Sequence, residues 1–238
     1  MTREGPDTLR QMRRTLRSEG MVVQPVKTRA PYVKGYGFTP EVVFDVGVGS
    51  GTPWLYRSFP DARFVLIDPQ ESCAAMVREK GVQTEFHFHA VAAGAQEGQA
   101  DLIVPWSGKG CEVEMASLLK RTDKLSKSFV RTDKQPVQVR PLDQIARGYP
   151  GRAGLKIDTE GYDIEVLRGA PETLARCEFV IMELSLSHRF DGISAPSDAV
   201  ALLKDAGLEL RDVLSIASGP GKRARPRYMN VLFTRWAQ

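Results

Sequence analysis

A strand that runs directly into closely spaced glycines constrains the fold of this chain most. Residues 42–46 are apolar except for Asp45, and every second residue from 47 to 51 is glycine. β-Branched and aromatic residues favour a buried strand, whereas glycine permits a tight turn and a close approach of the backbone to a ligand. A second apolar run, 64–67, ends at Asp68. The pattern predicts two parallel strands of an α/β sheet, with acids near their carboxyl ends.

The spacing of the glycines indicates the kind of ligand. Gly47, Gly49 and Gly51 read Gly-x-Gly-x-Gly, not the Gly-x-Gly-x-x-Gly of dinucleotide-binding folds, and no Gly-Lys-Ser/Thr of a phosphate-binding loop follows. An acid that ends the second strand, Asp68, suits ribose hydroxyls, which need a hydrogen-bond acceptor. We therefore expect S-adenosylmethionine (SAM) to bind here, with Asp45 and the glycines at its methionine end. The alternative is an ordinary tight turn in a nucleotide-free α/β protein.

Composition places the chain among globular proteins. With 238 residues, 42% of them apolar, it suits one α/β domain with a sizeable core. No apolar run approaches the roughly 20 residues of a membrane helix, and the basic first 30 residues lack the apolar stretch of a secretory signal. Three widely spaced cysteines form no disulfide or metal pattern, which fits a cytoplasmic location. A net charge of +4 does not by itself imply a nucleic-acid partner.

Residues 1–40 are expected to form an appendage to a domain that covers residues 41–238. Leu9, Met12 and Leu16 recur at helical spacing among arginines, which predicts a short amphipathic helix packed on the domain. A membrane- or acid-binding arm is the alternative, although a charged helix face is usually just solvated. Prolines and glycines then interrupt regular structure before the first core strand.

From residue 41 onward, strand-like and helix-like segments alternate, which predicts a largely parallel sheet. Strands are expected near residues 42–46, 63–67, 84–89, 100–104, 136–140, 153–157, 178–184, 208–215 and 228–234. Helices are expected near residues 52–58, 70–80, 141–147, 161–168, 171–176 and 196–206. The region near 105–135 is polar and basic, and we interpret it as a mobile loop and helix that form a lid over the ligand cleft. A solvated surface insertion is the alternative.

A second motif, residues 154–170, again joins an apolar strand to acids, a glycine and a helical stretch. Its core reads Lys-Ile-Asp-Thr-Glu-Gly and includes Asp158 and Glu160. Ligands of open parallel sheets bind outside the carboxyl ends of the strands. Together with Asp45 and Asp68, Asp158 ends a predicted strand, and so does Glu183. We expect these strand-end acids to converge on one cleft.

These motifs resemble the FkbM family of SAM-dependent O-methyltransferases over roughly residues 40–235. The matching segments are 44–51, 67–69, 90–94, 139–143, 156–161, 166–170 and 181–184. The resemblance implies a Rossmann-like class I methyltransferase fold, which is a mostly parallel seven-stranded sheet with an antiparallel last strand and helices on both faces. It also adds Ala92 to the expected cofactor-binding residues.

The sequence departs from the family pattern at several positions. Val48 and Gly49 stand where the family usually has Ala-Asn, and Asp68-Pro69 replaces its usual Glu-Pro. Asp163 replaces the usual Glu of the following helix. These changes shorten the expected ribose acceptor and remove one amide, so they alter the details of the cofactor contacts rather than the identity of the cofactor.

Methyl transfer to a hydroxyl needs a group that accepts the hydroxyl proton as charge develops. Asp158 is the first candidate for this base because it should end a central strand, and Glu160, Glu183 and His188 are alternatives. Glu160 could instead cap the following helix, and His188 could be a surface histidine. We interpret His87 and His89 as structural, because they alternate with phenylalanines along a predicted strand with one buried face.

Metal dependence is an open alternative at this stage. Mg²⁺ prefers oxygen ligands, and Asp158 with Glu183 could bind it together with substrate hydroxyls. The ion would then lower the pKa of the acceptor hydroxyl. A metal-free cluster of acids is the other interpretation.

The acceptor implied by the family resemblance is a hydroxylated small molecule, and the polar, basic segment near 105–135 favours a saccharide. An RNA methyltransferase is less consistent with the sequence, because Asp158-Thr-Glu-Gly161 replaces the Asn/Asp-Pro-Pro-Tyr/Phe of amino-methylating enzymes, and two acids would repel phosphate. A non-catalytic SAM-fold scaffold would not need the strand-end acids.

Overall fold

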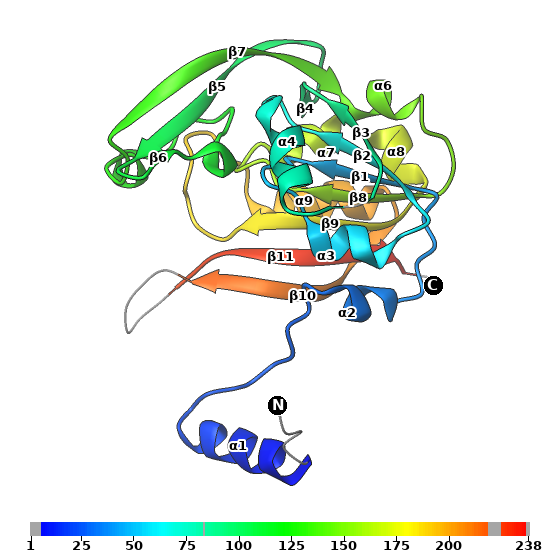
Figure 1. Ribbon diagram of the computed structural model, residues 1–238, viewed down its shortest axis with the longest axis vertical. Helices are drawn as coiled ribbons and strands as arrows, with labels where there is room; N and C mark the ends of the chain where they lie inside the picture. The colour runs from blue at the N-terminus through cyan, green and yellow to red at the C-terminus, as the bar shows by residue number, and fades with distance from the viewer. Residues whose placement is uncertain (1–5, 83, 219–224, 237–238) are drawn as a thin grey trace.

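The computed structural model describes residues 6–82, 84–218 and 225–236. A seven-stranded sheet lies at its centre (Figure 1), with the strand order β10-β11-β9-β8-β1-β2-β3. The strands are β1 (Val42–Val46), β2 (Arg63–Ile67), β3 (Phe86–His89), β8 (Ala153–Ile157), β9 (Cys177–Ser185), β10 (Leu208–Ser218) and β11 (Pro226–Arg235). All neighbouring pairs are parallel except those of β11, which runs antiparallel to both β9 and β10. The predicted Rossmann-like sheet with an antiparallel last strand is confirmed.

Helices cover both faces of this sheet, as predicted. One face packs against α6 (Leu142–Ala146), α7 (Asp163–Arg168), α8 (Pro171–Ala175) and α9 (Pro196–Asp205). The other face packs against α2 (Ala30–Lys34), α3 (Pro53–Ser58) and α4 (Ser72–Glu79). Among the described helices, none is long and apolar enough to cross a membrane.

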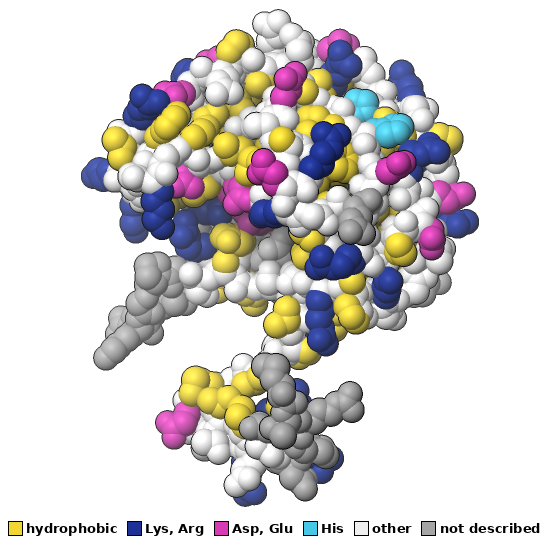
Figure 2. Space-filling view, viewed as in Figure 1, with side chains coloured by type: hydrophobic (Ala, Val, Ile, Leu, Met, Phe, Trp, Pro, Cys, Tyr) yellow, Lys and Arg dark blue, Asp and Glu magenta, His cyan; other side chains and the backbone are white. Residues whose placement is uncertain are grey.

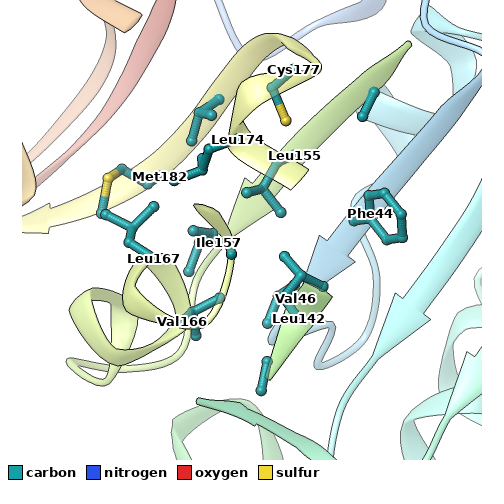
Figure 3. Close-up of a cluster of buried hydrophobic side chains, with 14 of the residues drawn as sticks. Phe44, Val46, Leu142, Leu155, Ile157, Val166, Leu167, Leu174, Cys177 and Met182 are labelled. Carbon is teal, nitrogen blue, oxygen red and sulfur yellow. The ribbon is translucent and has the colours of Figure 1, made fainter. Parts of the chain in front are cut away.

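The alternation of side chains along the strands produces two cores. In β1, Phe44 and Val46 point to one face, whereas Val43 points to the other. Figure 3 shows Phe44 and Val46 beside Leu155 and Ile157 of β8, under the helices of the first face. Each of these side chains is at most 1% exposed, and burying one contributes roughly 1.5–3 kcal/mol to folding.

The register of the central strands determines where the ligand cleft lies. Val46 of β1 is paired with Ile67 of β2 and with Ile157 of β8. The residues that follow these three, Gly47, Asp68 and Asp158, therefore leave the sheet at the same edge. The expected convergence of strand ends follows directly from this alignment.

A second sheet, in the order β4-β7-β5-β6, forms an arm that extends beyond the central sheet (Figure 1). Its strands are β4 (Ala92–Gly94), β5 (Gly98–Ser107), β6 (Gly110–Cys111) and β7 (Arg131–Pro141). Between β6 and β7 lie the short 3-10 helix η1 (Val113–Met115) and α5 (Asp123–Ser126).

The arm corrects the two ends of the loop and helix predicted near 105–135, whereas residues 112–130 do contain loops and the short helices η1 and α5. Residues 105–107 and 131–135 extend β5 and β7, which pair from Gly98 and Val139 to Trp106 and Arg131. Much of β7 is exposed on both faces, so its polar sequence lacks the apolar alternation that marks a half-buried strand. Hydrogen bonding between β5 and β7, which are far apart in the sequence, makes these residues a strand although their local sequence pattern does not indicate one.

The N-terminal segment contains the predicted helix, α1 (Pro6–Ser18), but this helix does not pack on the domain. Figure 1 shows α1 apart from the two sheets, and Leu9 and Met12 are about half exposed, at 53% and 52%. Contact with the domain begins further along, where Lys27 forms an ion pair of 2.5 Å with Asp212 of β10. The hydroxyls of Tyr32 and Tyr36 donate to the same carboxylate.

Candidate active site

A cavity of about 800 Å³ opens at the carboxyl ends of the parallel strands. It is lined by the loops after β1, β2, β8 and β9, by the arm, and by β11. Most of the residues expected at a site line this cavity, namely Gly47, Gly49, Gly51, Asp68, Ala92, Asp158, Glu160 and Glu183. Asp45 and His188 do not.

The glycine loop is built so that strand β1 can pass close to the end of β8. Gly47 has φ +75°, and a Cβ on it would lie 1.9 Å from the carbonyl oxygen of Asp158. Gly51 also has a positive φ, +93°, and a Cβ there would lie 3.0 Å from Val77 of α4. Gly47 therefore lets the two loops that carry the site touch, and a larger residue would separate them.

Replacement of Gly47 by alanine is expected to disrupt this contact. A non-glycine residue at such a φ costs about 1–2 kcal/mol, and the collision with Asp158 adds to that cost. We expect the G47A variant to unfold at lower denaturant concentration and to bind SAM more weakly. Gly49 is the matched control: its φ is +51°, but the nearest atom to a Cβ there would be in the flexible side chain of Glu114, at 3.3 Å, and the nearest backbone atom would be at 3.7 Å. Equal stability of G47A and G49A would contradict this account.

Asp68 holds the glycine loop from the end of β2. Its Oδ2 accepts a hydrogen bond of 3.2 Å from the backbone N–H of Gly49, and its Oδ1 accepts one of 2.9 Å from Gln70. Burial raises the pKa of Asp68 above its ordinary value, while the two amide hydrogen bonds oppose the shift. The carboxylate thus joins two loops and also lines the cavity.

Asp45 is placed behind the cavity wall, contrary to the expectation that it lines the methionine end. It is fully buried, accepts a hydrogen bond of 2.7 Å from Tyr56 and pairs with Lys156 Nζ at 3.1 Å. Lys156 also lies 3.6 Å from Asp158. Burial lowers the pKa of Lys156, but Asp45 and Asp158 outweigh this effect and raise it above its ordinary value. Lys156 is therefore a fixed cation that connects Asp45 to the cavity.

The turn after β8 presents Asp158 to the cavity. The carboxylate of Asp163, at the start of α7, accepts hydrogen bonds from the backbone N–H groups of Thr159 and Gly161, at 3.0 and 3.2 Å. Asp163 is only 8% exposed, so it holds the turn from inside. The side chain of Asp158 is 34% exposed, which makes it the most accessible of the expected catalytic acids in the cavity.

Glu160 adopts a conformation that proteins seldom tolerate. Its φ is +51°, and it is the one non-glycine residue with positive φ in the described part of the chain. Such backbone strain costs on the order of 1–3 kcal/mol and tends to occur at functional sites. The expected alternative, a simple helix cap, is not what the contacts show: the carboxylate points to two arginines instead.

Those arginines, Arg121 and Arg189, are the main residues that sequence reasoning missed. Nη2 of Arg189 lies 2.8 Å from Glu183 and 3.1 Å from Glu160, and Nη2 of Arg121 lies 3.4 Å from Glu160. Both arginines are buried, at 6% and 5% exposure. Burial raises the pKa of Glu160, and the two guanidinium charges oppose that shift.

His188 is exposed on the surface and lies outside the cavity, so the structure does not support it as a catalytic residue. The turn after β9 instead directs the next residue, Arg189, inward. Glu183 does reach the cavity from β9. Burial, followed by the charge of Asp158, raises the pKa of Glu183 to about 8.

The residues present do not fit the proposed Mg²⁺ site. Glu183 is hydrogen-bonded to a guanidinium, and Asp158 lies near the ammonium of Lys156. These two cations would repel a divalent ion. The described residues also contain no group of three or more His, Cys, Asp or Glu side chains that could hold a metal.

A family model for the Methyltransferase FkbM domain matches residues 45–212. The chain is similar to the crystal structure of Methyltransferase FkbM from Methylobacillus flagellatus KT, with 16% identity and a TM-score of 0.50. That alignment covers 89% of this chain and 48% of the other, so this chain spans about half the length of that protein.

A further similar structure is magnesium protoporphyrin IX methyltransferase from Synechocystis PCC 6803 with bound SAM. The identity is 12% and the TM-score 0.46, over 99% of this chain and 100% of that one. A search of the curated proteins finds no match.

The family match extends from β1 into β10 and covers more than half of the chain. The chain therefore belongs to the FkbM family of SAM-dependent methyltransferases.

Proposed function

We propose that this protein transfers a methyl group from SAM to a hydroxyl of a small-molecule acceptor, which is a saccharide or a glycosylated metabolite. The observation that carries the proposal is the placement of Asp158. This carboxylate is accessible from the cavity and lies on a turn that Asp163 holds by hydrogen bonding, and the backbone of Asp158 packs closely against Gly47 of the glycine loop. A positioned carboxylate can accept the proton of an otherwise weakly nucleophilic hydroxyl.

The cofactor is inferred to occupy the part of the cavity between the glycine loop and Asp68. The positive φ angles of Gly47 and Gly51, and the steric limits at both, make a turn that lets a ligand approach the backbone. Asp68 is the acid at the end of β2 that suits ribose hydroxyls. When bound, SAM supplies an electrophilic methyl group on a sulfonium. Ala92, on β4, lines the same cavity.

The chain's own residues perform the remaining work. Asp158 accepts the hydroxyl proton, and Lys156 holds that carboxylate in place from 3.6 Å while its own charge is shared with Asp45. Positioning the reacting groups contributes a large part of such catalysis. The arm supplies a cover: the Ser117 hydroxyl donates to the carbonyl of Glu160, and Gln70 donates to Val113.

The walls of the acceptor end suit a polar ring compound. Aromatic rings of Phe129, Phe190 and Tyr228 lie beside the carboxylates and guanidiniums that line the cavity. Asn230 of β11 adds an amide. Alternating apolar surfaces and paired polar groups match the faces and hydroxyls of a saccharide.

The pH dependence of the reaction should distinguish Asp158 from Glu183 as the base. A carboxyl with a pKa of about 8 is mostly protonated at neutral pH and cannot accept a proton there. If Glu183 were the base, kcat/KM would rise about tenfold per pH unit well below pH 8 and about fivefold between pH 7 and 8. We expect no such rise between pH 7 and 8, and we expect E183Q, which imitates the protonated form, to stay active. If E183Q is well folded but inactive, Glu183 and not Asp158 is the base.

Chelation should leave the enzyme active. Lys156 is paired with Asp158 and Arg189 with Glu183, so the acids that a divalent ion would need already have cationic partners. We therefore expect EDTA to change the rate of methyl transfer by less than about twofold, as for a reaction without a metal. Activity that disappears with EDTA and returns with Mg²⁺ or Mn²⁺ would show that the acids bind metal after all.

The proposed acceptor class can be tested with purified protein, SAM and two sets of acceptors. One set contains hydroxylated saccharides and glycosides, and the other contains unmodified RNA. Formation of the demethylated product, S-adenosylhomocysteine, should depend on a member of the first set. Turnover with RNA and with none of the saccharides would contradict the proposal and indicate an RNA methyltransferase.

A further inference from the structure

Two buried guanidinium groups in the cavity wall have few partners. The side chains of Arg121 and Arg189 are 7% and 6% exposed. Each guanidinium carries five N–H donors. In the described part of the chain, both use only Nη2 for side-chain hydrogen bonds: Arg121 to Glu160, and Arg189 to Glu160 and Glu183. Nη1 and Nε of each remain without such a bond.

One of these donors is also shut off from solvent. Arg189 Nε is buried and has no hydrogen-bond partner among the described residues. Within the described part of the chain, the one carboxylate paired with Arg121 is that of Glu160, which lies 3.4 Å away and is shared with Arg189. Leaving a buried polar group unsatisfied costs about 1–3 kcal/mol, and more when the group is charged. Burial accordingly lowers the pKa of Arg121.

The two arginines are held in place rather than free to turn toward water. Both stack on Phe190, at 5.0 and 5.2 Å from the ring centre. Arg121 also stacks on Phe129 of the arm, and Arg189 on Tyr228 of β11. A backbone bridge joins Arg121 to Phe190. Rigid, partly desolvated arginines of this kind favour a planar or tetrahedral oxyanion.

The charge balance of the cavity is uneven from one end to the other. At the arginine end, two guanidiniums face Glu160 and Glu183, and burial raises the pKa of Glu183 to about 8, so it is largely neutral at pH 7. At the other end, a single ammonium, Lys156, faces both Asp45 and Asp158. The arginine end is thus electropositive and the Asp158 end electronegative.

Exposed lysines continue the positive charge onto the arm. Figure 2 shows Lys and Arg side chains gathered on the side of the molecule where the arm ends. Lys109, Lys124 and Lys127 are exposed between β5 and β7, whereas the charge of Lys120 is paired with Asp123 and Asp191. Charge of one sign around a cleft raises the local concentration of oppositely charged ligands.

We propose that the acceptor is acidic, and that its carboxylate or phosphate monoester binds Arg121 and Arg189 while the hydroxyl to be methylated faces Asp158. This inference rests on the proposed function, since it assumes that the acceptor occupies this cavity. It narrows the acceptor from any hydroxylated saccharide to one with an oxyanion, such as a uronic acid or a sugar phosphate. The fixed separation between the arginines and Asp158 would then select which hydroxyl is presented.

The test compares binding of glucose, glucuronate and glucose 6-phosphate to the full chain saturated with S-adenosylhomocysteine. We expect at least one acidic probe to bind about tenfold more tightly than glucose, the scale of one charge-assisted hydrogen bond. R121Q should remove that preference. K120Q is the matched control, because Lys120 is the adjacent residue, carries the same charge, is exposed, and does not line the cavity. The two acidic probes separate a carboxylate site from a phosphate site.

Two outcomes would overturn the proposal. One is that neither acidic probe binds more tightly than glucose, and the other is that R121Q binds the acidic probe as the wild type does. The affinity for S-adenosylhomocysteine reports whether R121Q is folded. If R121Q is not folded, the proposal is decided by whether the wild-type protein binds an acidic probe more tightly than glucose. Arginine-dependent binding without methyl transfer to any acceptor would contradict the proposed function only. Methyl transfer to neutral acceptors that is insensitive to R121Q would contradict the acidic acceptor only.

Discussion

Replacing Asp158 with asparagine should reduce turnover by about 10²–10⁴-fold, the usual contribution of a general base. The amide keeps the size of the side chain but cannot accept the hydroxyl proton. Asp158 lies at the cavity rather than in the core, and its side chain is 34% exposed, so the fold should survive the change. SAM affinity should change little, because the proposed role acts on the acceptor. Rapid-quench measurement of methyl transfer, with calorimetry of S-adenosylhomocysteine binding, separates these effects.

The control for this experiment is Asp163, which holds the same turn but has no proposed contact with the acceptor. D163N should lower stability, because Asp163 accepts hydrogen bonds from the Thr159 and Gly161 amides, and the chemical step should suffer less in whatever fraction is folded. Near-wild-type turnover of D158N on a true acceptor would make Asp158 structural. Glu160 or Glu183 would then have to be the base.

Replacing Asp68 with alanine should weaken SAM binding by about 1.5–3 kcal/mol, the range for a hydrogen bond to a charged group. The change removes the inferred ribose acceptor and also the two hydrogen bonds that Asp68 accepts from Gly49 and Gln70. Calorimetric titration with SAM measures the loss directly.

D68E is the informative companion variant, because the related family usually has glutamate at this position. It retains the acceptor on a longer side chain, so it should bind SAM better than D68A does. If D68A binds SAM as tightly as the wild type, Asp68 shapes the loop without contacting the cofactor.

The sequence was sufficient for the central sheet because local pattern and tertiary structure agree there. The apolar strand before Gly47 and the one before Asp68 are buried on both faces, as parallel strands of an α/β sheet should be. Their register then brings Gly47, Asp68 and Asp158 together without any further information. The strand-end acids could be predicted for the same reason, with the exception of Asp45, whose side chain points behind the wall toward Lys156.

The arginine pair could not be predicted in the same way. Arg121 lies in a polar stretch in which the sequence Arg-Thr-Asp-Lys occurs twice, and its contacts with Glu160 and Phe190 distinguish it from the exposed Arg131. Arg189 follows His188, which the sequence suggests as an alternative base, but the turn after β9 buries the arginine and exposes the histidine. Both positions depend on contacts between segments far apart in the chain, which a single sequence does not reveal.

The most direct test of the central claim is to follow the methyl group itself. The wild-type protein should be incubated with SAM labelled with ¹³C on the transferred methyl, together with saccharide acceptors that include the acidic ones. Two-dimensional NMR then identifies the atom to which the labelled carbon becomes attached. The account predicts a new methyl ether, formed in equal amount with S-adenosylhomocysteine and absent with D158N. A labelled methyl on nitrogen or carbon, or the same methyl ether with D158N at the wild-type rate, would contradict it.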